Sequence, residues 1–358
     1  MSLRPSPPRA ARRGAIALLA VAACSPVVVP DAAPAPAGSL AAAVGLLLPP
    51  APTATLDRLV GVYADGADTV LVLEADGRLL ALGADSARRP LQARGDGARF
   101  VAPLPDGDSV VVRAEGSGAH LDAWGRRWRL ADVAPTGGAS FRIVPQRPVE
   151  ELRREALAAM PPAQPDSLLA PELVELVRLD PTIRLDVRYA TTDNFMGARF
   201  YDEPRAFLQR PAAEALVRAH RRLRALGLGV VVHDAYRPWY VTRMFWDATP
   251  PHQRDFVADP ASGSRHNRGA AVDVGLYDLA TGEPLVMPSG YDEFTRRAHA
   301  DFPGGTARQR ALRGLLRRAM EAEGFAVYAP EWWHFDHAGW RRYPVLNRPF
   351  AELGPGAA

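Results

Sequence analysis

The first part of the chain alternates apolar and polar side chains with a period of two, from about Leu56 to Val144. Such alternation predicts strands with one buried face, here at residues 59–63, 69–74, 78–82, 109–114 and 121–130. The pair Asp76-Gly77 stands between two of these runs and favours a two-residue hairpin turn. We therefore expect a small antiparallel all-β domain or barrel over residues 55–145.

This β domain contains three side chains that bear on binding, namely His120, Trp124 and Trp128. They could line a ligand surface, but packing in the core or across a hairpin is the favoured interpretation, since aromatic rings are usual at both places. The domain shows no recognisable catalytic arrangement. A role in wall binding stays open.

The second part of the chain mixes helical and strand patterns. Pro211 favours the first turn of a helix that closes at Gly227, and Thr306 with Gln309 predicts a capping box for a helix that ends before Gly324. Apolar runs predict strands at residues 228–233, 270–276, 325–328 and 333–336. Strands and helices do not alternate regularly, so we expect an α+β fold with a small antiparallel sheet.

These patterns divide the chain into consecutive segments. The β domain is followed by a linker at residues 146–167, which includes a short helix over 150–160 and the pair Pro161-Pro162. We place the α+β domain at residues 168–350 and a short tail at 351–358. A Pro- and Ala-rich linker over residues 24–54 precedes the β domain and suits an extended tether.

The N-terminal residues are typical of a targeting segment. Four arginines precede an apolar run that ends in Val21-Ala-Ala-Cys24, which resembles the bacterial lipobox. We expect residues 1–23 to be a lipoprotein signal peptide and Cys24, the chain's single cysteine, to carry the lipid. The protein is then an exported, periplasmic lipoprotein anchored in a membrane, and Ser25 favours the outer membrane. The alternative is an ordinary cleaved signal with an incidental cysteine.

The net charge of +3 comes from the signal segment. All 43 basic residues are arginine, and loss of the four within residues 1–23 leaves 39 against 40 acidic residues. Because the mature chain is nearly neutral, we expect no nucleic-acid partner. The absence of lysine excludes Schiff-base and P-loop chemistry. Oligomeric state is not indicated.

Two segments near the C-terminus offer metal ligands. His266 and Asp273 lie seven residues apart, and Asp273 stands between two valines of a predicted strand, where an unpaired carboxylate is costly to bury. Glu331 and His334 lie in an aromatic-rich turn that leads into a strand. Two imidazoles and one carboxylate are a usual catalytic zinc set, and a further carboxylate can act as base. His337 is a rival ligand to His334.

A third segment, Asp234-Ala-Tyr-Arg237, follows the predicted strand at residues 228–233. A cation at a strand end can stabilise an oxyanion or hold a substrate carboxylate. Arg237 could equally pair with Asp234, and the spacing alone does not decide between the two.

The motifs Ser264-x-His-x-x-Gly-x-Ala-x-Asp273 and Glu331-x-Trp-His334 resemble those of the D-alanyl-D-alanine dipeptidases, a family of zinc peptidases. Flanking segments resemble the family in the same order, at residues 179–195, 210–216 and 289–294. The resemblance covers residues 168–345, about half of the chain.

The resemblance implies a role for each candidate residue. Zn²⁺ would be held by His266, Asp273 and His334, with Glu331 as general base and then acid, and Arg237 at the oxyanion. The substrate's amino end would be held by Asp234 and Asp292 with Tyr189 nearby, and its carboxylate by Ser264.

The expected activity is zinc-dependent hydrolysis of the dipeptide D-Ala-D-Ala to D-alanine, outside the cytoplasm and in the turnover of cell-wall peptides. Two alternatives remain from the sequence. One is a zinc D,D-carboxypeptidase or endopeptidase that acts on peptidoglycan peptides. The other is a non-catalytic wall-binding lipoprotein.

Overall fold

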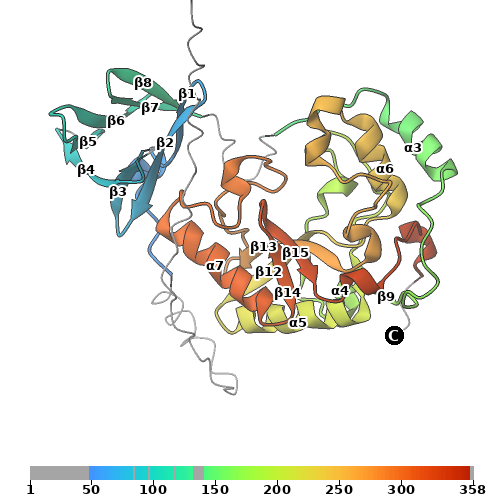
Figure 1. The fold of residues 1–358 in the computed structure, drawn as a ribbon. Coiled ribbons are helices and arrows are strands. Elements are labelled where there is room, and N and C mark those ends of the chain that lie inside the picture. The colour runs from blue at the N-terminus through green and yellow to red at the C-terminus, as the bar shows by residue number, and fades with distance from the viewer. Residues whose placement is uncertain (1–47, 84, 96, 117, 132–140, 355–358) are drawn as a thin grey trace, which may run out of the picture. The chain divides into compact units, whose positions relative to one another are not determined.

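The structure is a computed structural model that describes residues 48–83, 85–95, 97–116, 118–131 and 141–354 (Figure 1). The predicted signal peptide, Cys24 and most of the Pro/Ala-rich linker lie outside these residues. No helix in the described ranges has the length and apolar content that a membrane crossing needs.

The N-terminal part is a closed barrel of eight antiparallel strands, each paired with the next along the chain. Tyr63 of the first strand pairs with Leu130 of the last and closes it. A single helical turn, α2 (Ala54–Asp57), precedes the barrel. The strands are β1 (Gly61–Asp65), β2 (Asp68–Ala75), β3 (Arg78–Leu82), β4 (Arg88–Arg94), β5 (Arg99–Pro103), β6 (Ser109–Glu115), β7 (Gly118–Ala123) and β8 (Arg126–Leu130).

The predicted hairpin at Asp76-Gly77 is confirmed, and both residues adopt the positive φ that this turn requires. The prediction of one strand over residues 121–130 is wrong. Trp124 and Gly125, also at positive φ, turn the chain between β7 and β8. Strands β4 and β5 were not predicted.

The barrel interior is filled by apolar side chains that alternate along the strands, as the period of two requires. Trp128 is one of them, whereas Trp124 is 38% exposed and meets Trp128 edge-on. Packing is therefore the observed state of Trp128. His120 is buried, with Nδ1 3.1 Å from the Glu115 carboxylate.

The C-terminal part is built on a five-stranded sheet of order β10-β12-β13-β15-β14. Strand β10 runs parallel to β12, and the other three pairs are antiparallel. A separate antiparallel pair joins β9 to β11. The strands are β9 (Leu173–Glu175), β10 (Arg184–Leu185), β11 (Phe207–Gln209), β12 (Leu228–Asp234), β13 (Ala271–Asp278), β14 (Phe325–Tyr328) and β15 (Glu331–His337).

The predicted small antiparallel sheet is thus correct only in part, because the sheet is mixed and a second small sheet accompanies it. A parallel partner as short as β10 leaves no alternation for a sequence pattern to detect. The prediction that Glu331 lies in a turn before its strand is also wrong, since β15 begins at Glu331.

Five α-helices surround these strands: α3 (Val149–Ala158), α4 (Leu176–Leu179), α5 (Arg210–Arg224), α6 (Trp239–Ala248) and α7 (Ala307–Glu321). The capping box at Thr306 and Gln309 is confirmed. Helix α5 has Pro211 in its first turn, as predicted, and Gly227 adopts positive φ just beyond its end. Helix α6 was not predicted.

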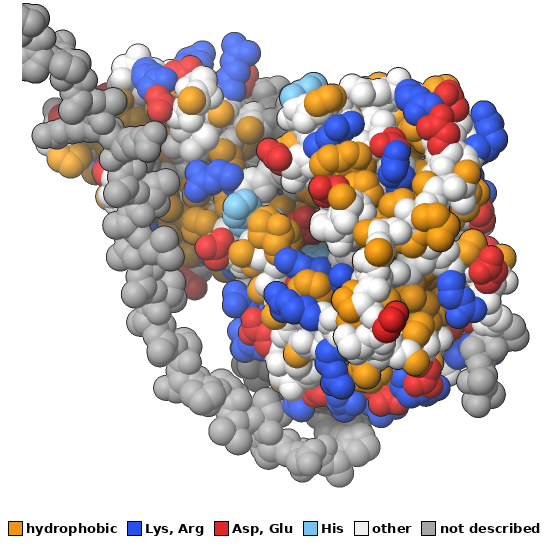
Figure 2. All heavy atoms as spheres, turned by 45° about the vertical axis from the view of Figure 1, so that its right-hand side comes forward, with side chains coloured by type: hydrophobic (Ala, Val, Ile, Leu, Met, Phe, Trp, Pro, Cys, Tyr) orange, Lys and Arg blue, Asp and Glu red, His pale blue; other side chains and the backbone are white. Residues whose placement is uncertain are grey.

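Helices α5 and α7 cover one face of the sheet (Figure 1). Leu216 of α5 and Leu316 of α7 share a core with Val272 and Val274 of β13. Because neighbouring strand residues point to opposite faces, Asp273 points away from these helices. A second, aromatic core formed largely by α6 and the loops around it lies elsewhere in this part. Figure 2 shows basic and acidic side chains interleaved over one face of the molecule.

Candidate metal centre and substrate cavity

Two adjacent strands place the first pair of candidate ligands side by side. Asp273 of β13 and His334 of β15 are direct partners in the antiparallel register. Their side chains stand on the same face, with Asp273 Oδ1 2.9 Å from His334 Nδ1. The strand pairing alone thus brings together two residues that are far apart in the sequence.

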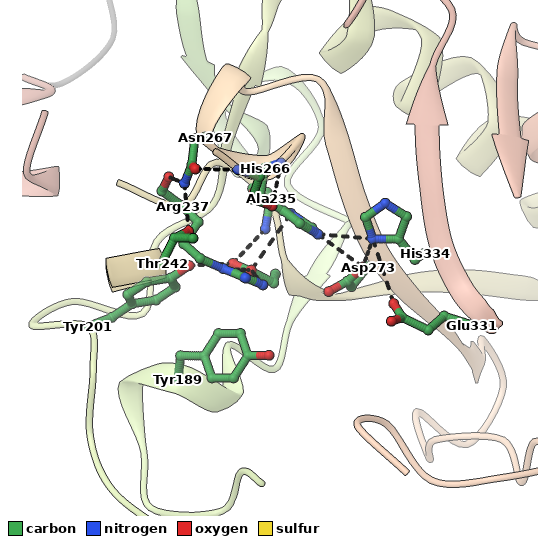
Figure 3. A network of polar contacts seen from close by, with 12 residues as sticks. Tyr189, Tyr201, Ala235, Arg237, Thr242, His266, Asn267, Asp273, Glu331 and His334 are labelled. Atoms are coloured by element: carbon green, nitrogen blue, oxygen red, sulfur yellow. Dashed lines mark hydrogen bonds and ion pairs between the residues drawn. The ribbon is translucent and has the colours of Figure 1, made fainter. Parts of the chain in front are cut away.

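His266 reaches the pair from a loop. It begins a short 3₁₀ helix, His266–Arg268, which ends at Gly269 in the left-handed conformation. The imidazole Nδ1 lies 2.7 Å from the carbonyl oxygen of Ala235 and donates to it, so Nε2 faces the strands. This Nε2 lies 3.0 Å from His334 Nδ1 and 3.4 Å from Asp273 Oδ1 (Figure 3).

These three buried side chains form the one group suited to a metal ion among the described residues. Ligand atoms about 2.0–2.1 Å from a tetrahedral zinc are roughly 3.4 Å apart, close to the separations found here. Two nitrogens and one carboxylate oxygen are also the donor types that zinc prefers. The set therefore fits a zinc ion.

The electrostatics of the group point the same way. Burial lowers the pKa of His334, but hydrogen bonds to Asp273 and Asp336 outweigh it and raise that pKa to about 10. Burial raises the pKa of Asp273, yet the imidazoles of His266 and His334 hold it well below its usual range. Both shifts show that a positive charge between the three side chains is favourable.

The rival ligand His337 lies on the opposite face of β15, since it stands three positions after His334 and side chains alternate along a strand. Its ring contacts Phe325, and its Nδ1 accepts from the Gly339 amide. The structure therefore groups His334, not His337, with His266 and Asp273.

Glu331 stands at the edge of the group. Its Oε2 lies 3.9 Å from His334 Nδ1, too far for a hydrogen bond, and it lines the cavity beside the three candidate ligands. Burial raises the pKa of the Glu331 carboxyl, with Asp273 adding to the shift and the two imidazoles opposing it. A raised pKa makes a carboxylate a stronger base, and its place beside the candidate ligands suits it to proton transfer there.

Arg237 lies directly after β12 with its guanidinium against Asp234. Nε and Nη2 donate to Asp234 Oδ2 at 2.9 and 2.7 Å. The other oxygen, Oδ1, accepts from the Tyr201 hydroxyl at 2.6 Å and from the Ala235 amide. Asp234 is 1% exposed and does not line the cavity, whereas Arg237 does. Arg237 therefore pairs with Asp234 and also faces the cavity, so the two possibilities left open by the spacing are compatible.

Asp292 forms a second acidic point in the cavity. It is buried, has a positive φ of 57°, and accepts from the Tyr189 hydroxyl at 3.0 Å. Burial, joined by the charge of Asp273, raises the pKa of its carboxyl well above the usual range. A buried carboxyl of this kind gains most from a cation that enters the cavity.

Ser264 lines the cavity on the side of the His266 loop. Its hydroxyl accepts from the His266 amide at 3.2 Å, and its own amide donates to Asn267 Oδ1. Asn267 in turn donates to the carbonyl of Arg237 and to Thr242. One asparagine thus ties the loop with the first candidate ligand to the loop with Arg237 (Figure 3).

The cavity itself has a volume of about 300 Å³, which is at the small end of ligand pockets. Its apolar wall is aromatic: Phe195, Phe245, Phe256 and Phe294 line it. Of the residues predicted for the site, all except Asp234 line the cavity. A site of this size suits a small, charged molecule.

Three residues of this site were not predicted from the sequence. Tyr291 donates from its hydroxyl to Asp273 Oδ2 at 2.9 Å, Tyr201 holds Asp234, and Asp336 contacts His334 Nε2 at 3.0 Å. Asp336 had a signal, because it stands two residues after His334 in a predicted strand and so shares its face. Tyr291 stands in the segment 289–294 that resembles the family, but nothing in the sequence singled out its hydroxyl, and Tyr201 had no signal.

Comparison with known proteins places this geometry in context. A family model described as D-ala-D-ala dipeptidase matches residues 170–353. The chain is 36% identical over 186 residues to the D-alanyl-D-alanine dipeptidase of Escherichia coli K12, which covers 52% of this chain and 95% of that protein.

Two other relatives carry the same name. The protein of Enterococcus faecalis V583 is 34% identical over 188 residues, covering 48% of this chain and 89% of its own length. The protein of Streptomyces coelicolor is 36% identical over 171 residues, which cover 43% of this chain and 85% of that protein. The family match contains every site residue described above and excludes the barrel.

Proposed function

Because the chain belongs to the D-Ala-D-Ala dipeptidase family of metallopeptidases, we propose that it hydrolyses the dipeptide D-Ala-D-Ala to two molecules of D-alanine. We further propose that zinc, held by His266, Asp273 and His334, is its cofactor. The observation that carries the proposal is one small cavity that joins this ligand set to a buried acidic point, Asp292, and to Glu331.

A bound zinc ion supplies Lewis acidity to the scissile carbonyl and to water. The Glu331 carboxylate accepts a proton from the attacking water, whose oxygen forms the new bond to the carbonyl carbon. As the C–N bond breaks, Glu331 returns the proton to the leaving nitrogen. The second proton of the water passes from the new carboxylic acid to the amine, so the products are one carboxylate and one ammonium group.

Arg237 stabilises the negative charge that develops on the carbonyl oxygen. Its orientation is fixed before substrate enters, because the hydrogen bonds to Asp234 hold the guanidinium over the rings of Tyr189 and Phe245. Both oxygens of Asp234 already have donors, so we assign Asp234 to this positioning role rather than to the substrate's amine.

The substrate's ammonium group is bound by Asp292 with Tyr189 beside it, and the substrate's carboxylate by Ser264. Burial disfavours the ionised form of Asp292, and a bound ammonium group would favour it again by pairing with the carboxylate. A longer peptide places an uncharged amide there and leaves the carboxylate site or the amine site without its partner, which costs several kcal/mol in a buried setting. This requirement favours dipeptides.

We propose in addition that the protein is exported and anchored in a membrane through a lipid on Cys24, with the outer membrane favoured. The support is the arginine-rich head, the short apolar run and the lipobox-like Val21-Ala-Ala-Cys24. Outside the cytoplasm the substrate would come from the turnover of cell-wall peptides.

The activity is tested by incubating the purified protein, with zinc, with D-Ala-D-Ala, L-Ala-L-Ala and a pentapeptide that ends in D-Ala-D-Ala, and measuring released alanine. Cleavage of the D,D-dipeptide alone, lost on chelation and restored by zinc, supports the proposal. Cleavage of the pentapeptide would instead make the enzyme a carboxypeptidase.

The Asp292→Asn variant sharpens this test. If Asp292 binds the ammonium, the variant loses activity on D-Ala-D-Ala, while a carboxypeptidase that has no use for a free amine keeps its rate on the pentapeptide. Asp301→Asn, which changes an exposed aspartate outside the cavity, is the matched control and should behave as the wild type.

A further inference from the structure

A second carboxylate on β15 stands behind the ligand His334. Asp336 lies two residues further along the strand and therefore on the same face. Its Oδ1 is 3.0 Å from His334 Nε2, and its side chain is only 13% exposed. An ionised carboxylate offers acceptors alone, so His334 donates from Nε2.

Asp336 is itself fixed by a cation. Arg265 Nη1 donates to Asp336 Oδ2 at 2.6 Å, so each carboxylate oxygen has its own donor. The Arg265 guanidinium lies over the rings of Tyr328, at 5.0 Å, and Trp340, at 5.5 Å. Contact with these two aromatic rings favours the orientation in which the arginine reaches Asp336.

The hydrogen bond at Nε2 decides which nitrogen of His334 is free. A neutral imidazole carries one N–H, and the acceptor it finds determines the tautomer. When His334 gives up one proton to bind a metal, the Nε2–H stays with Asp336 and the lone pair lies on Nδ1, the atom that faces Asp273 and His266. In His266 the tautomer is set by a backbone carbonyl, which accepts from Nδ1–H and leaves Nε2 free to bind a metal.

We propose that Asp336 is a positioning residue that holds His334 in the tautomer and orientation required for zinc, and that Arg265 fixes Asp336 for this purpose. The inference rests on the metal site proposed above and goes beyond it, since it assigns zinc affinity to two residues outside the ligand set. Arg265 directly precedes His266, so adjacent residues of one loop serve two different ligands.

The test is zinc affinity, measured by competition with a chelating dye on the full chain at neutral pH. We expect Asp336→Ala to weaken binding about 10–100-fold, which is the usual effect of losing such a partner. Asp336→Asn keeps a carbonyl acceptor for Nε2–H and should recover part of the loss. Arg265→Ala keeps the Asp336 carboxylate as acceptor but removes the arginine that holds it in place. Its zinc affinity should lie between those of Asp336→Asn and Asp336→Ala.

Two further measurements separate positioning from a general structural role. In zinc-loaded wild-type protein the His334 Nε2–H proton should give a downfield NMR signal that Asp336→Ala removes. Asp122→Ala removes a carboxylate that pairs with Arg113 and Arg127 in the barrel, and it should leave zinc affinity unchanged. Thermal unfolding of the zinc-free variants reports any loss of stability that does not involve the metal.

Each outcome bears on a different statement. Zinc affinity within twofold of the wild type in Asp336→Ala would overturn the inference and leave the proposed function intact. Wild-type protein that binds no zinc would overturn the metal site itself. If Asp336→Ala does not fold, Asp336→Asn and Arg265→Ala carry the test, and unchanged affinity in both would equally reject the positioning role.

Discussion

The barrel of residues 61–130 buries the inner face of its strands, whereas the mixed sheet of residues 184–337 buries both faces of its central strands β12 and β13. The two parts also differ in the kind of side chain that they bury. The buried positions of the barrel are apolar apart from Glu74 and His120 among the residues described. The sheet and its loops bury Asp234, Arg237, Asp273, Asp292 and two histidines within one site. Burying ionisable groups is costly unless they are paired, so their convergence marks the part of the molecule where chemistry takes place.

The difference also explains why the two parts tolerate different changes. In the barrel, stability depends on filling volume, and any apolar side chain of suitable size serves. In the site, each charge depends on a specific partner, as Arg237 does on Asp234. A substitution in the barrel core should therefore alter stability, and a substitution in the site should alter activity or metal binding.

The largest effect is expected for Glu331→Gln, which keeps the shape of the side chain but cannot accept the proton. We expect kcat to fall about 10²–10⁴-fold, with zinc affinity close to wild type because Glu331 is not within the ligand set. Alanine release and dye competition measure the two quantities. Glu321→Gln on α7, paired with Arg317 at the surface, is the matched control. Unchanged turnover in Glu331→Gln would remove the assigned base from the mechanism.

A barrel variant tests the other side of the comparison. Leu121 is fully buried in the barrel core, and Leu121→Ala should reduce the free energy of unfolding by about 2–5 kcal/mol. Chemical denaturation measures it. The activity and zinc affinity of the folded fraction should not change. Leu80→Ala, at a partly exposed position of β3, should cost clearly less. A lower kcat in fully folded Leu121→Ala would mean that the barrel takes part in catalysis.

The sequence predicts some features of the site and misses others. Motif spacing points to His266 and Asp273 and leaves His334 and His337 as rivals for the third ligand, and the resemblance to the dipeptidase family implies His334. It does not predict that Asp234 lies beneath Arg237 rather than in the cavity. That placement depends on an irregular register between β12 and β13 just before Asp234, and such irregularities leave no pattern in the sequence.

The missed strand β4 has a similar cause. In β4, a single residue, Leu91, is buried, and Pro90 and three arginines surround it. With one apolar position there is no alternation to count. The site residue Tyr291 lies in a loop outside every strand and helix, and tertiary folding alone brings its hydroxyl to Asp273.

His220 sharpens the comparison, because it is a buried ionisable group of the C-terminal part that lies outside the site. Its Nδ1 accepts from the Val230 amide, and its Nε2 contacts the Thr182 hydroxyl. Burial lowers its pKa to about 4, with the charge of Asp180 opposing the shift. Such a residue serves the fold, and its effect should appear in stability.

The sign of that effect follows from linkage. Above pH 6.5 the imidazole is neutral in both states, and below that value the unfolded chain binds a proton that folded His220 refuses until pH 4. Stability should therefore fall by up to about 3 kcal/mol from pH 6.5 to 4. Denaturation of wild type and His220→Gln across this range isolates the contribution. If the free energy of unfolding varied with pH in the same way in both proteins, the assigned effect of His220 would be contradicted.

The smallest effect is expected for Tyr291→Phe, which removes the hydroxyl that donates to Asp273 Oδ2 but keeps the ring against His233 and Trp333. Because a ligand carboxylate that loses this bond is held less firmly, we expect zinc binding to weaken about tenfold with little change in stability. Tyr277→Phe removes a hydroxyl that donates to a backbone carbonyl outside the site and should not alter zinc binding. Equal zinc affinity in the two variants would show that the ligands are oriented by the backbone and by Asp336 alone.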